Sequence, residues 1–263
     1  MPASSRLSSI CITLLTECLD SLEASPTGLE DEEVVHALRV ATKRLRAAWK
    51  IGAAAVGEEF ETERADVLRE MSALLAGNRD LAVLVNLSRE LAGRHSEPGF
   101  EDVVEHLESK FSTTNDSDAL ETIRKMIRSE IEAWRKVTFA TEADETRAHR
   151  HAIRGSLRKG KAATREAIRD TDAEVWHDWR KRVKRLRYQR EFLAGIQGRN
   201  PGVRDLRISR LGSRLGDRND LANLTEVVSE LGNSPPLRKA LASEERGIMS
   251  NCRRLGRRNL VRP

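Results

Sequence analysis

The feature that most constrains this chain is a basic pattern that occurs twice. Residues 36–46 read HALRVATKRLR and residues 177–187 read HDWRKRVKRLR, so both fit H-x-x-R-x-x-x-K-R-L-R at an offset of 141 residues. A shorter echo follows each copy, because residues 77–81 (GNRDL) resemble residues 217–221 (DRNDL) at an offset of 140. Two features that recur at nearly the same distance predict a duplicated structural unit.

The segments around and between these motifs have helical spacing. Gly, Pro, Ser and Asn cluster at a few short breaks, and no run of alternating β-branched residues competes with the helical period. The duplicated unit is therefore expected to be a bundle of about four helices per half, with one or two further helices in an insertion at 93–140. The expected helices are 4–23, 29–51, 59–76, 79–92, 100–111, 117–138, 146–170, 172–195, 203–216, 219–231 and 236–252.

Local signals set the expected ends of the elements. Thr27 and Glu30 have the spacing of a capping box, which predicts a helix that starts at Leu29. The C-terminal residues 253–263 hold five arginines and are expected to form a loose basic tail. We expect one domain over 1–263, with an N-terminal half at 1–138 and a C-terminal half at 139–252.

The net charge of +5 conceals a division between the two halves. Residues 1–140 carry 17 Lys and Arg against 25 Asp and Glu, a net charge of −8, whereas residues 141–263 carry 29 against 16, a net charge of +13. We therefore expect one acidic and one basic flank, and the basic flank should attract polyanions in a salt-dependent way.

Cysteine use and hydropathy favour a cytoplasmic protein. Cys11, Cys18 and Cys252 form no CxxC pair and, being three, cannot all be bridged, which is typical of a reduced protein. The apolar run at residues 10–19 is interrupted by two threonines and a glutamate. It is expected to be a core helix rather than a signal peptide or a membrane span.

The first basic motif forms a single stripe on a helical wheel. At about 100° per residue, His36, Arg39, Lys43 and Arg46 fall within an arc of about 80°. Apolar residues lie roughly opposite, so the helix can bury one side and present its cations on the other. These apolar residues are Val34, Leu38, Ala41, Leu45 and Trp49.

The second motif repeats this arrangement. Its cationic stripe comprises His177, Arg180, Lys184 and Arg187, with Lys181 and Tyr188 beside it. Its apolar side comprises Val175, Trp179, Val183, Leu186 and Leu193.

Most charged helical stripes are simply solvated faces, but these two differ in composition. A solvated face usually mixes Glu with Lys, whereas no acidic residue occurs between His36 and Arg46. Like charges at i,i+3 and i,i+4 repel one another, and their repetition at matching positions favours an anion that compensates them.

The paired motifs resemble those of the CHAD domain, the conserved histidine α-helical domain. Residues 36–46 match its H-x-x-R-V-x-x-[RK]-R-L-R helix, and residues 177–188 match its H-x-x-R-K-x-x-K-x-L-R-Y helix. Arg79-Asp80 and Asn219-Asp220 resemble the turns of the family. The resemblance covers nearly the whole chain. It implies an all-α fold of two helical bundles related by a pseudo-twofold axis around a central basic cavity or pore.

The same resemblance implies that the protein binds inorganic polyphosphate without catalysis, needs no cofactor, and is directed to polyphosphate granules or to granule proteins. Bound phosphate should favour protonated His36 and His177. The residues implied to contact polyphosphate are His36, Arg39, Lys43, Arg44, Arg46, Arg79, Arg158, Lys161, His177, Arg180, Lys181, Lys184, Arg185, Arg187 and Tyr188. One departure is Leu157-Arg158-Lys159-Gly160-Lys161, where the family often has Tyr-x-x-Gly-Arg, which puts a hydroxyl donor and a bidentate arginine contact in doubt.

The sequence fits three other functions less well. The six histidines form no HExxH pattern or Cys/His cluster, which disfavours a metal site. The chain has no P-loop, GxSxG or dinucleotide motif, which disfavours an enzyme. Nucleic-acid binding is the main alternative, because the same cations would contact its phosphates. Aromatic residues make up only 4% of the chain, however, which leaves few surfaces on which bases could stack.

Overall fold

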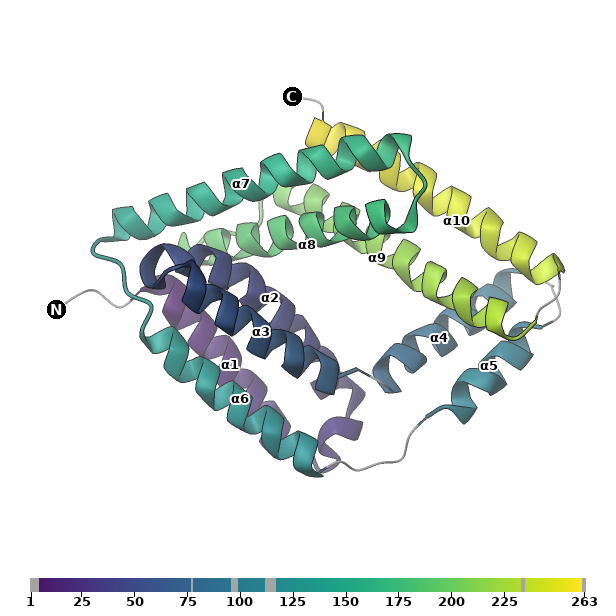
Figure 1. Cartoon of the computed structure of the whole chain (residues 1–263), viewed down its shortest axis with the longest axis horizontal. Coiled ribbons are helices and arrows are strands. Elements are labelled where there is room, and N and C mark those ends of the chain that lie inside the picture. Colours follow the sequence, from purple (N-terminus) through teal and green to yellow (C-terminus); the bar gives the residue numbers. More distant parts are fainter. Residues whose placement is uncertain (1–4, 77, 96–98, 112–116, 233–234, 262–263) are drawn as a thin grey trace. The chain divides into compact units, whose positions relative to one another are not determined.

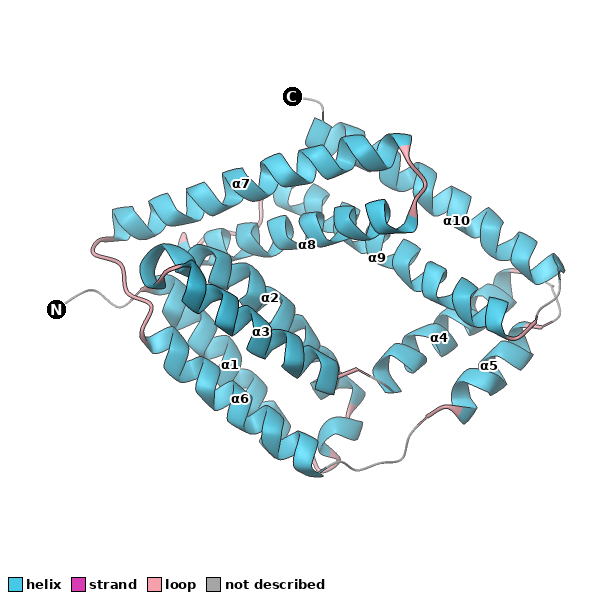
Figure 2. Ribbon diagram, in the orientation of Figure 1, coloured by secondary structure: helices cyan, strands magenta, loops and turns pink. Residues whose placement is uncertain are grey.

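The computed structural model describes residues 5–76, 78–95, 99–111, 117–232 and 235–261. In this part of the chain the fold is all-α, as expected, and it contains no strand (Figures 1 and 2). None of these helices has the length and hydropathy needed to cross a bilayer. The α-helices are α1 (Arg6–Ala24), α2 (Glu32–Val56), α3 (Glu58–Leu74), α4 (Asn78–Arg94), α5 (Phe100–Ser109), α6 (Ser117–Arg135), α7 (Glu142–Arg169), α8 (Ala173–Ile196), α9 (Val203–Glu230) and α10 (Pro235–Gly256).

The start of α2 differs from the expected capping box. Thr27 makes no side-chain cap, and residues Gly28–Glu30 form a separate 3-10 turn. Asp31 caps α2 instead, because its carboxylate accepts hydrogen bonds from two backbone N–H groups of the first turn, at 3.0 and 3.2 Å. A carboxylate at the N-cap also faces the positive end of the helix dipole, so Asp31 is a stronger cap than Thr27.

α9 is one helix where two were expected, at 203–216 and 219–231. The helix continues through Gly216, because a lone glycine weakens a helix by only about 1 kcal/mol. A continuous apolar stripe outweighs this cost. Its buried members are Ile208, Leu211, Leu215, Leu221, Leu224 and Val228.

The C-terminal residues are helical rather than loose. α10 reaches Gly256 and is followed by a π-helix, η2 (Arg257–Val261), in which the side chain of Leu260 is 0% exposed. A Cβ atom on Gly256 would lie 2.6 Å from the ring of Trp179 and 2.8 Å from the methyl group of Thr164. Glycine at this position therefore allows the end of α10 to approach its neighbours closely.

The chain divides into two compact units that are interleaved along the sequence. Unit 1 contains the described residues within 1–76, 114–159 and 184–205, and unit 2 contains those within 77–113, 160–183 and 206–263. These boundaries differ from those of the sequence halves 1–138 and 139–252. The second basic motif falls in both units, because the division within α8 comes after Val183.

Each unit has its own apolar core. In unit 1, Trp49 of α2 stacks on Trp134 of α6 with ring centres 3.9 Å apart, and α1 and the end of α8 contribute to the same core. In unit 2, α4 and α5 pack with α9 and α10 around buried residues such as Leu107 and Leu224. Both basic motifs therefore lie on helices whose other faces are buried.

Candidate functional site

The first basic motif occupies the N-terminal part of α2 in unit 1. As the helical wheel predicts, Leu38, Ala41 and Leu45 are buried. On the other side His36 is exposed, and the side chains of Arg39, Lys43, Arg44 and Arg46 are partly buried. These cations thus lie at the boundary between the core and the surface, where they are less screened than on an open surface.

Arg39 also has a structural contact that the sequence did not reveal. Its Nη1 donates a hydrogen bond to the backbone carbonyl of Leu75, the C-cap residue of α3, at 2.7 Å. A cation at this end of a helix is favourable because the last carbonyls are unpaired within the helix and carry partial negative charge. Arg39 therefore fixes the end of α3.

Arg46 is partly buried near one other positive charge. Partial burial lowers its pKa, and the charge of Arg69 on α3 lowers it further. Both causes disfavour the charged guanidinium. An anion bound beside Arg46 would reverse the electrostatic part of this penalty.

The first half of α8 places His177, Arg180 and Lys181 in unit 2. Nδ1 of His177 lies 3.4 Å from the side-chain oxygen of Asn219 in α9. Asn219 belongs to the second short echo of the repeat, so the two sequence features of this half contact each other. The amide of Asn219 helps to orient the imidazole ring of His177.

The second half of α8 returns the motif to unit 1, where it meets α2. Nε2 of Gln189 donates a hydrogen bond to the backbone carbonyl of Ala47 at 3.4 Å. The guanidinium carbon of Arg44 lies 5.6 Å from the centre of the Phe192 ring. Ala47 directly follows the first motif, and Gln189 comes two residues after the second. The C-terminal ends of the two motifs therefore adjoin within one compact unit.

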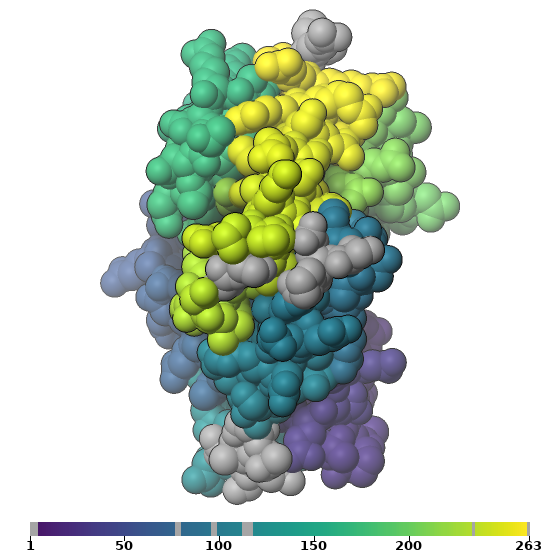
Figure 3. Space-filling model, turned by 90° about the vertical axis from the view of Figure 1, so that its right-hand side faces the viewer, coloured from purple at the N-terminus to yellow at the C-terminus, as the bar shows by residue number. Residues whose placement is uncertain are grey.

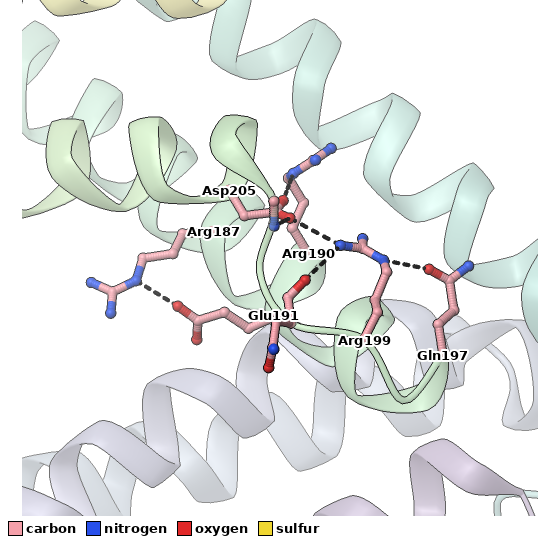
Figure 4. A network of polar contacts seen from close by, with 8 residues as sticks. Arg187, Arg190, Glu191, Gln197, Arg199 and Asp205 are labelled. Carbon is pink, nitrogen blue, oxygen red and sulfur yellow. Dashed lines mark hydrogen bonds and ion pairs between the residues drawn. The ribbon is translucent and has the colours of Figure 1, made fainter.

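The end of the second motif includes a compensated cation. Nε of Arg187 lies 2.7 Å from a carboxylate oxygen of Glu191, and both side chains are partly exposed (Figure 4). Tyr188 is buried, with the guanidinium carbon of Arg187 5.5 Å from its ring centre. Lys184 and Arg185 are partly buried and Lys181 is exposed. Arg187 thus has a carboxylate partner one turn later in α8. The sequence of the first motif, residues 36–46, contains no acidic residue.

A buried carboxylate orders the connection that follows this motif. Asp205 of α9 accepts hydrogen bonds from Arg190, from Arg199 at 3.2 Å and from the backbone N–H of Gly202 at 2.8 Å (Figure 4). Burial alone would raise the pKa of Asp205, but these hydrogen bonds and the charge of Arg190 hold it below its usual value. This network fixes the end of α8 relative to the start of α9.

Arg158 and Lys161 lie on α7, which carries further cations besides these two. No acidic residue occurs between Glu145 and Glu166, and exposed or half-exposed cations recur there every three or four residues. The absence of acids was the signal that could have found them, as it did for α2. The cations of this α7 face are Arg147, Arg150, Arg154, Arg158, Lys161 and Arg165.

The two dipeptides that resemble turns of the family both lie in helices, in agreement with the helices expected at 79–92 and 219–231. Arg79-Asp80 belongs to the first turn of α4, and Asn219-Asp220 lies inside α9. The side chain of Arg79 lies outside the described part of the structure, so its predicted contact with phosphate stays a prediction.

Side chains that could bind a metal ion or act as nucleophiles do not form a site in the part of the chain that the structure describes. No three His, Cys, Asp or Glu side chains come together there in a way that could hold a metal ion. The three cysteines are free and buried. Burial raises the pKa of Cys18 to about 11 and that of Cys252 to about 12, which keeps both thiols protonated and unreactive.

Comparisons with known proteins agree with this architecture. The family model of the CHAD domain matches residues 13–229. PptA from Streptomyces chartreusis has a similar fold, with a TM-score of 0.64 at 18% identity over 100% of both chains. The CHAD domain from the plant Ricinus communis has a TM-score of 0.59 at 19% identity, over 100% of this chain and 94% of that one. No curated protein matches the sequence. Because the family model spans most of its length, the chain belongs to the CHAD domain family.

Proposed function

We propose that this protein binds inorganic polyphosphate through the cationic faces of α2 and α8 and catalyses no reaction on it. The observation that carries the proposal is the contact between Gln189 and Ala47, which brings the ends of two matching basic motifs together in unit 1. Two independent sets of cations can then act on one extended anion. A role in directing the protein to polyphosphate granules is part of the same proposal.

The chemistry of these helices suits a phosphate chain. Polyphosphate has a charge on every unit and no bases, so guanidinium forks and ammonium groups can satisfy its oxygens without further recognition. The penalty on the charged form of Arg46 supports this assignment, because a nearby phosphate would offset the effect of Arg69. On this proposal Arg158 and Lys161 of α7 also contact phosphate.

Nucleic acid is the second candidate, since its phosphates would meet the same cations. The aromatic side chains argue against it. The four tryptophans, Trp49, Trp134, Trp176 and Trp179, are each at most 1% exposed, and Tyr188 is buried. Bases would therefore find few rings on which to stack, and stacking is a main source of affinity for single strands.

The proposal is tested by competition. Long-chain polyphosphate labelled with a fluorophore is bound to the purified protein, and unlabelled polyphosphate, tripolyphosphate, heparin, RNA and duplex DNA are titrated against it at several salt concentrations. We expect long-chain polyphosphate to compete best and its affinity to fall steeply with salt. Equal or tighter binding of RNA or duplex DNA would overturn the proposal in favour of nucleic acid.

A matched pair of substitutions tests the site itself. Lys43→Glu with Lys184→Glu changes the same position of both motifs and spares Arg39, which also holds α3. We expect this double variant to lose polyphosphate binding while it keeps its helical circular-dichroism spectrum. Arg238→Glu with Lys239→Glu, two exposed residues of α10, changes the net charge equally and should leave most binding intact. Equal losses in the two variants would show that only net charge matters.

A further inference from the structure

We propose that a groove at the C-terminal end of α10 is a second anion site, which takes a stretch of phosphate chain independently of the basic motifs. The groove has a volume of about 840 Å³ and lies within unit 2, along α10 and η2 and beside Thr171, which precedes α8. Figure 3 shows α10, in yellow, at the surface of the molecule. The arginines that line the groove are Arg246, Arg253, Arg254, Arg257 and Arg258.

The lining of this groove has an unusual charge balance. Besides the five arginines it contains the hydroxyl groups of Thr171 and Ser250 and the side chain of Met249, but no acidic residue among those described. Within the described part of the chain, none of the five arginines forms an ion pair with a carboxylate. Arg254 donates a hydrogen bond to the neutral amide oxygen of Asn251, at 2.9 Å.

Another pocket of unit 2 provides a contrast. It lies against α4, α9 and α10 and contains arginines that are neutralised by neighbouring carboxylates. Arg94 pairs with Glu90, and Arg214 pairs with Asp217 at 3.0 Å. The arginines of that pocket are thus paired with acids, whereas the described lining of the α10 groove contains arginines and no acid. Positive charge that is concentrated in a concave site attracts anions.

The groove is also held in a fixed shape. Arg253 is immobilised, because its Nε and Nη2 donate to the backbone carbonyls of Ala167 and Asp170, at 3.3 and 3.0 Å, and its guanidinium carbon lies 5.4 Å from the Trp176 ring centre. Beyond it, Gly256 presses against Trp179, and the buried Leu260 anchors η2. This leaves Arg257 and Arg258 projecting from an ordered π-helix. Groups that are ordered before binding lose less entropy when a ligand arrives.

Stabilisation of the helix end does not explain the whole set. Arginines in the last turn of a helix interact favourably with its dipole, which accounts for Arg253 and Arg254. This effect is confined to the last turn, yet Arg246 lies about two turns before it, and Arg257 and Arg258 lie beyond the α-helical part. A ligand that spans all of these positions accounts for them together.

The lining identifies the chemical class of the ligand. Arginine forks and hydroxyl donors match phosphoryl oxygens, and guanidinium groups bind them in a bidentate manner. The aromatic rings beneath the groove, Trp176 and Trp179, are buried and offer no surface to a base. A chain of phosphates therefore fits better than a nucleic acid. The inference takes this ligand from the proposed function, but it concerns a different set of residues.

The test counts binding sites with tripolyphosphate, using isothermal titration calorimetry. We expect the wild-type protein to show two sites. Arg254→Glu with Arg257→Glu should weaken one of them by at least about tenfold, since two attractive charges become repulsive. Arg238→Glu with Lys239→Glu, at the other end of the same helix, should keep both sites. Lys43→Glu with Lys184→Glu should lose the other site and retain the groove. Thermal unfolding checks that each variant is folded, and Arg257→Gln with Arg258→Gln replaces the groove variant if that one is not.

The possible outcomes separate the two proposals. If the groove variant binds as the wild type does, or weakens no more than the α10 control, the second site is overturned and the proposed function stands. If the Lys43 and Lys184 variant keeps all binding while the groove variant loses it, the motif site is overturned and the groove is supported. Failure of every protein to bind either tripolyphosphate or long-chain polyphosphate would overturn both.

Discussion

The indole Nε1 of Trp49 donates a hydrogen bond to a carboxylate oxygen of Glu130 at 2.9 Å, and both side chains are 0% exposed. Burial raises the pKa of Glu130 to about 7, although this hydrogen bond and the charge of Arg64, 3.6 Å away, act in the opposite direction. The core of unit 1 therefore contains an acid that titrates near neutral pH.

Replacement of Glu130 by glutamine should remove a pH dependence of stability. Because the pKa of Glu130 is about 4.5 in the unfolded chain and about 7 in the fold, the folded state holds the proton more tightly. The free energy of unfolding should thus fall as pH rises from about 4.5 to 7, by up to about 3 kcal/mol. Glu130→Gln keeps an oxygen for Trp49 and cannot ionise.

Urea unfolding at pH values between 4 and 8 measures this effect. Glu132→Gln on the same helix is the control, since that carboxylate is exposed. Parallel stability curves for the wild type and Glu130→Gln would contradict the prediction.

His149 should produce the opposite dependence. Its side chain is 0% exposed, neither ring nitrogen has a hydrogen-bond partner among the described residues, and burial lowers its pKa from 6.5 to about 4. Stability linked to His149 is therefore lost as pH falls from about 6.5 through 4. His149→Leu should remove this loss and leave the protein at least as stable at pH 7, because a buried polar group without partners is replaced by an apolar one.

The same urea series tests this prediction, with His151→Leu as the control on the exposed face of α7. Between about pH 4.5 and 6.5 the effects of Glu130 and His149 on the unfolding free energy oppose each other. Each single variant should therefore show the pH dependence of the unfolding free energy that the other residue causes. A wild-type-like curve for His149→Leu in acid would show that the imidazole does not titrate as expected.

Two glycines of α10 should respond in opposite ways to alanine. Gly256→Ala places a methyl group 2.6 Å from the ring of Trp179, so we expect a loss of about 1–3 kcal/mol in the free energy of unfolding. Gly247→Ala adds a methyl group with no other atom within 4 Å and should stabilise the helix by about 0.5–1 kcal/mol. Thermal unfolding of the two variants makes the comparison, and equal melting temperatures would refute the close contact.

The hydrogen bonds of Asp205 should be more valuable than an exposed ion pair. Asp205→Ala leaves Arg190 and the N–H of Gly202 without their acceptor, and we expect it to cost about 2–3 kcal/mol. Asp217→Ala removes an exposed partner of Arg214 and should cost less than about 1 kcal/mol. Denaturant unfolding measures the loss of unfolding free energy in each variant. Similar losses would mean that the hydrogen bonds of Asp205 add no more stability than an exposed ion pair.

The salt dependence of polyphosphate binding should reveal the number of cations involved. Each Lys or Arg that meets a phosphate releases counterions, so the affinity falls with salt concentration on a logarithmic plot. Lys43→Gln with Lys184→Gln removes two such contacts and should make the slope shallower by between about one and two. Fluorescence titrations at several salt concentrations measure the slope, and an unchanged slope would place both lysines outside the binding surface.

Local features of the fold could be predicted from the sequence, because they depend on residues close together in the chain. The buried positions of α2, such as Leu38 and Leu45, follow from the helical period alone. The ends of the helices are harder to predict from the sequence. Asp31 and Thr27 are both suitable cap residues, and only the path of the backbone selects Asp31. The unbroken α9 differs from the two expected helices because its buried apolar residues continue on both sides of Gly216.

The candidate site could be predicted only as a list of cations, and its spatial relationships could not. The contact between His177 and Asn219 joins residues on different helices, and no spacing along the chain encodes it. The same is true of Gln189 and Ala47. The arginines near the C-terminus were expected to be loose, but they are helical. Their order depends on the fit of Gly256 against Trp179, and the sequence does not specify this packing.

Arg39 belongs both to the cationic stripe of α2 and to the end of α3, where it holds the carbonyl of Leu75. A guanidinium that a backbone acceptor already restrains has less rotational freedom left to lose, so part of the cost of receiving an anion is met during folding. By thermodynamic reciprocity, an anion that engages Arg39 would also protect the last turn of α3 from fraying. Binding of the anion would then slow the exchange of the amide hydrogens near Leu75 with solvent.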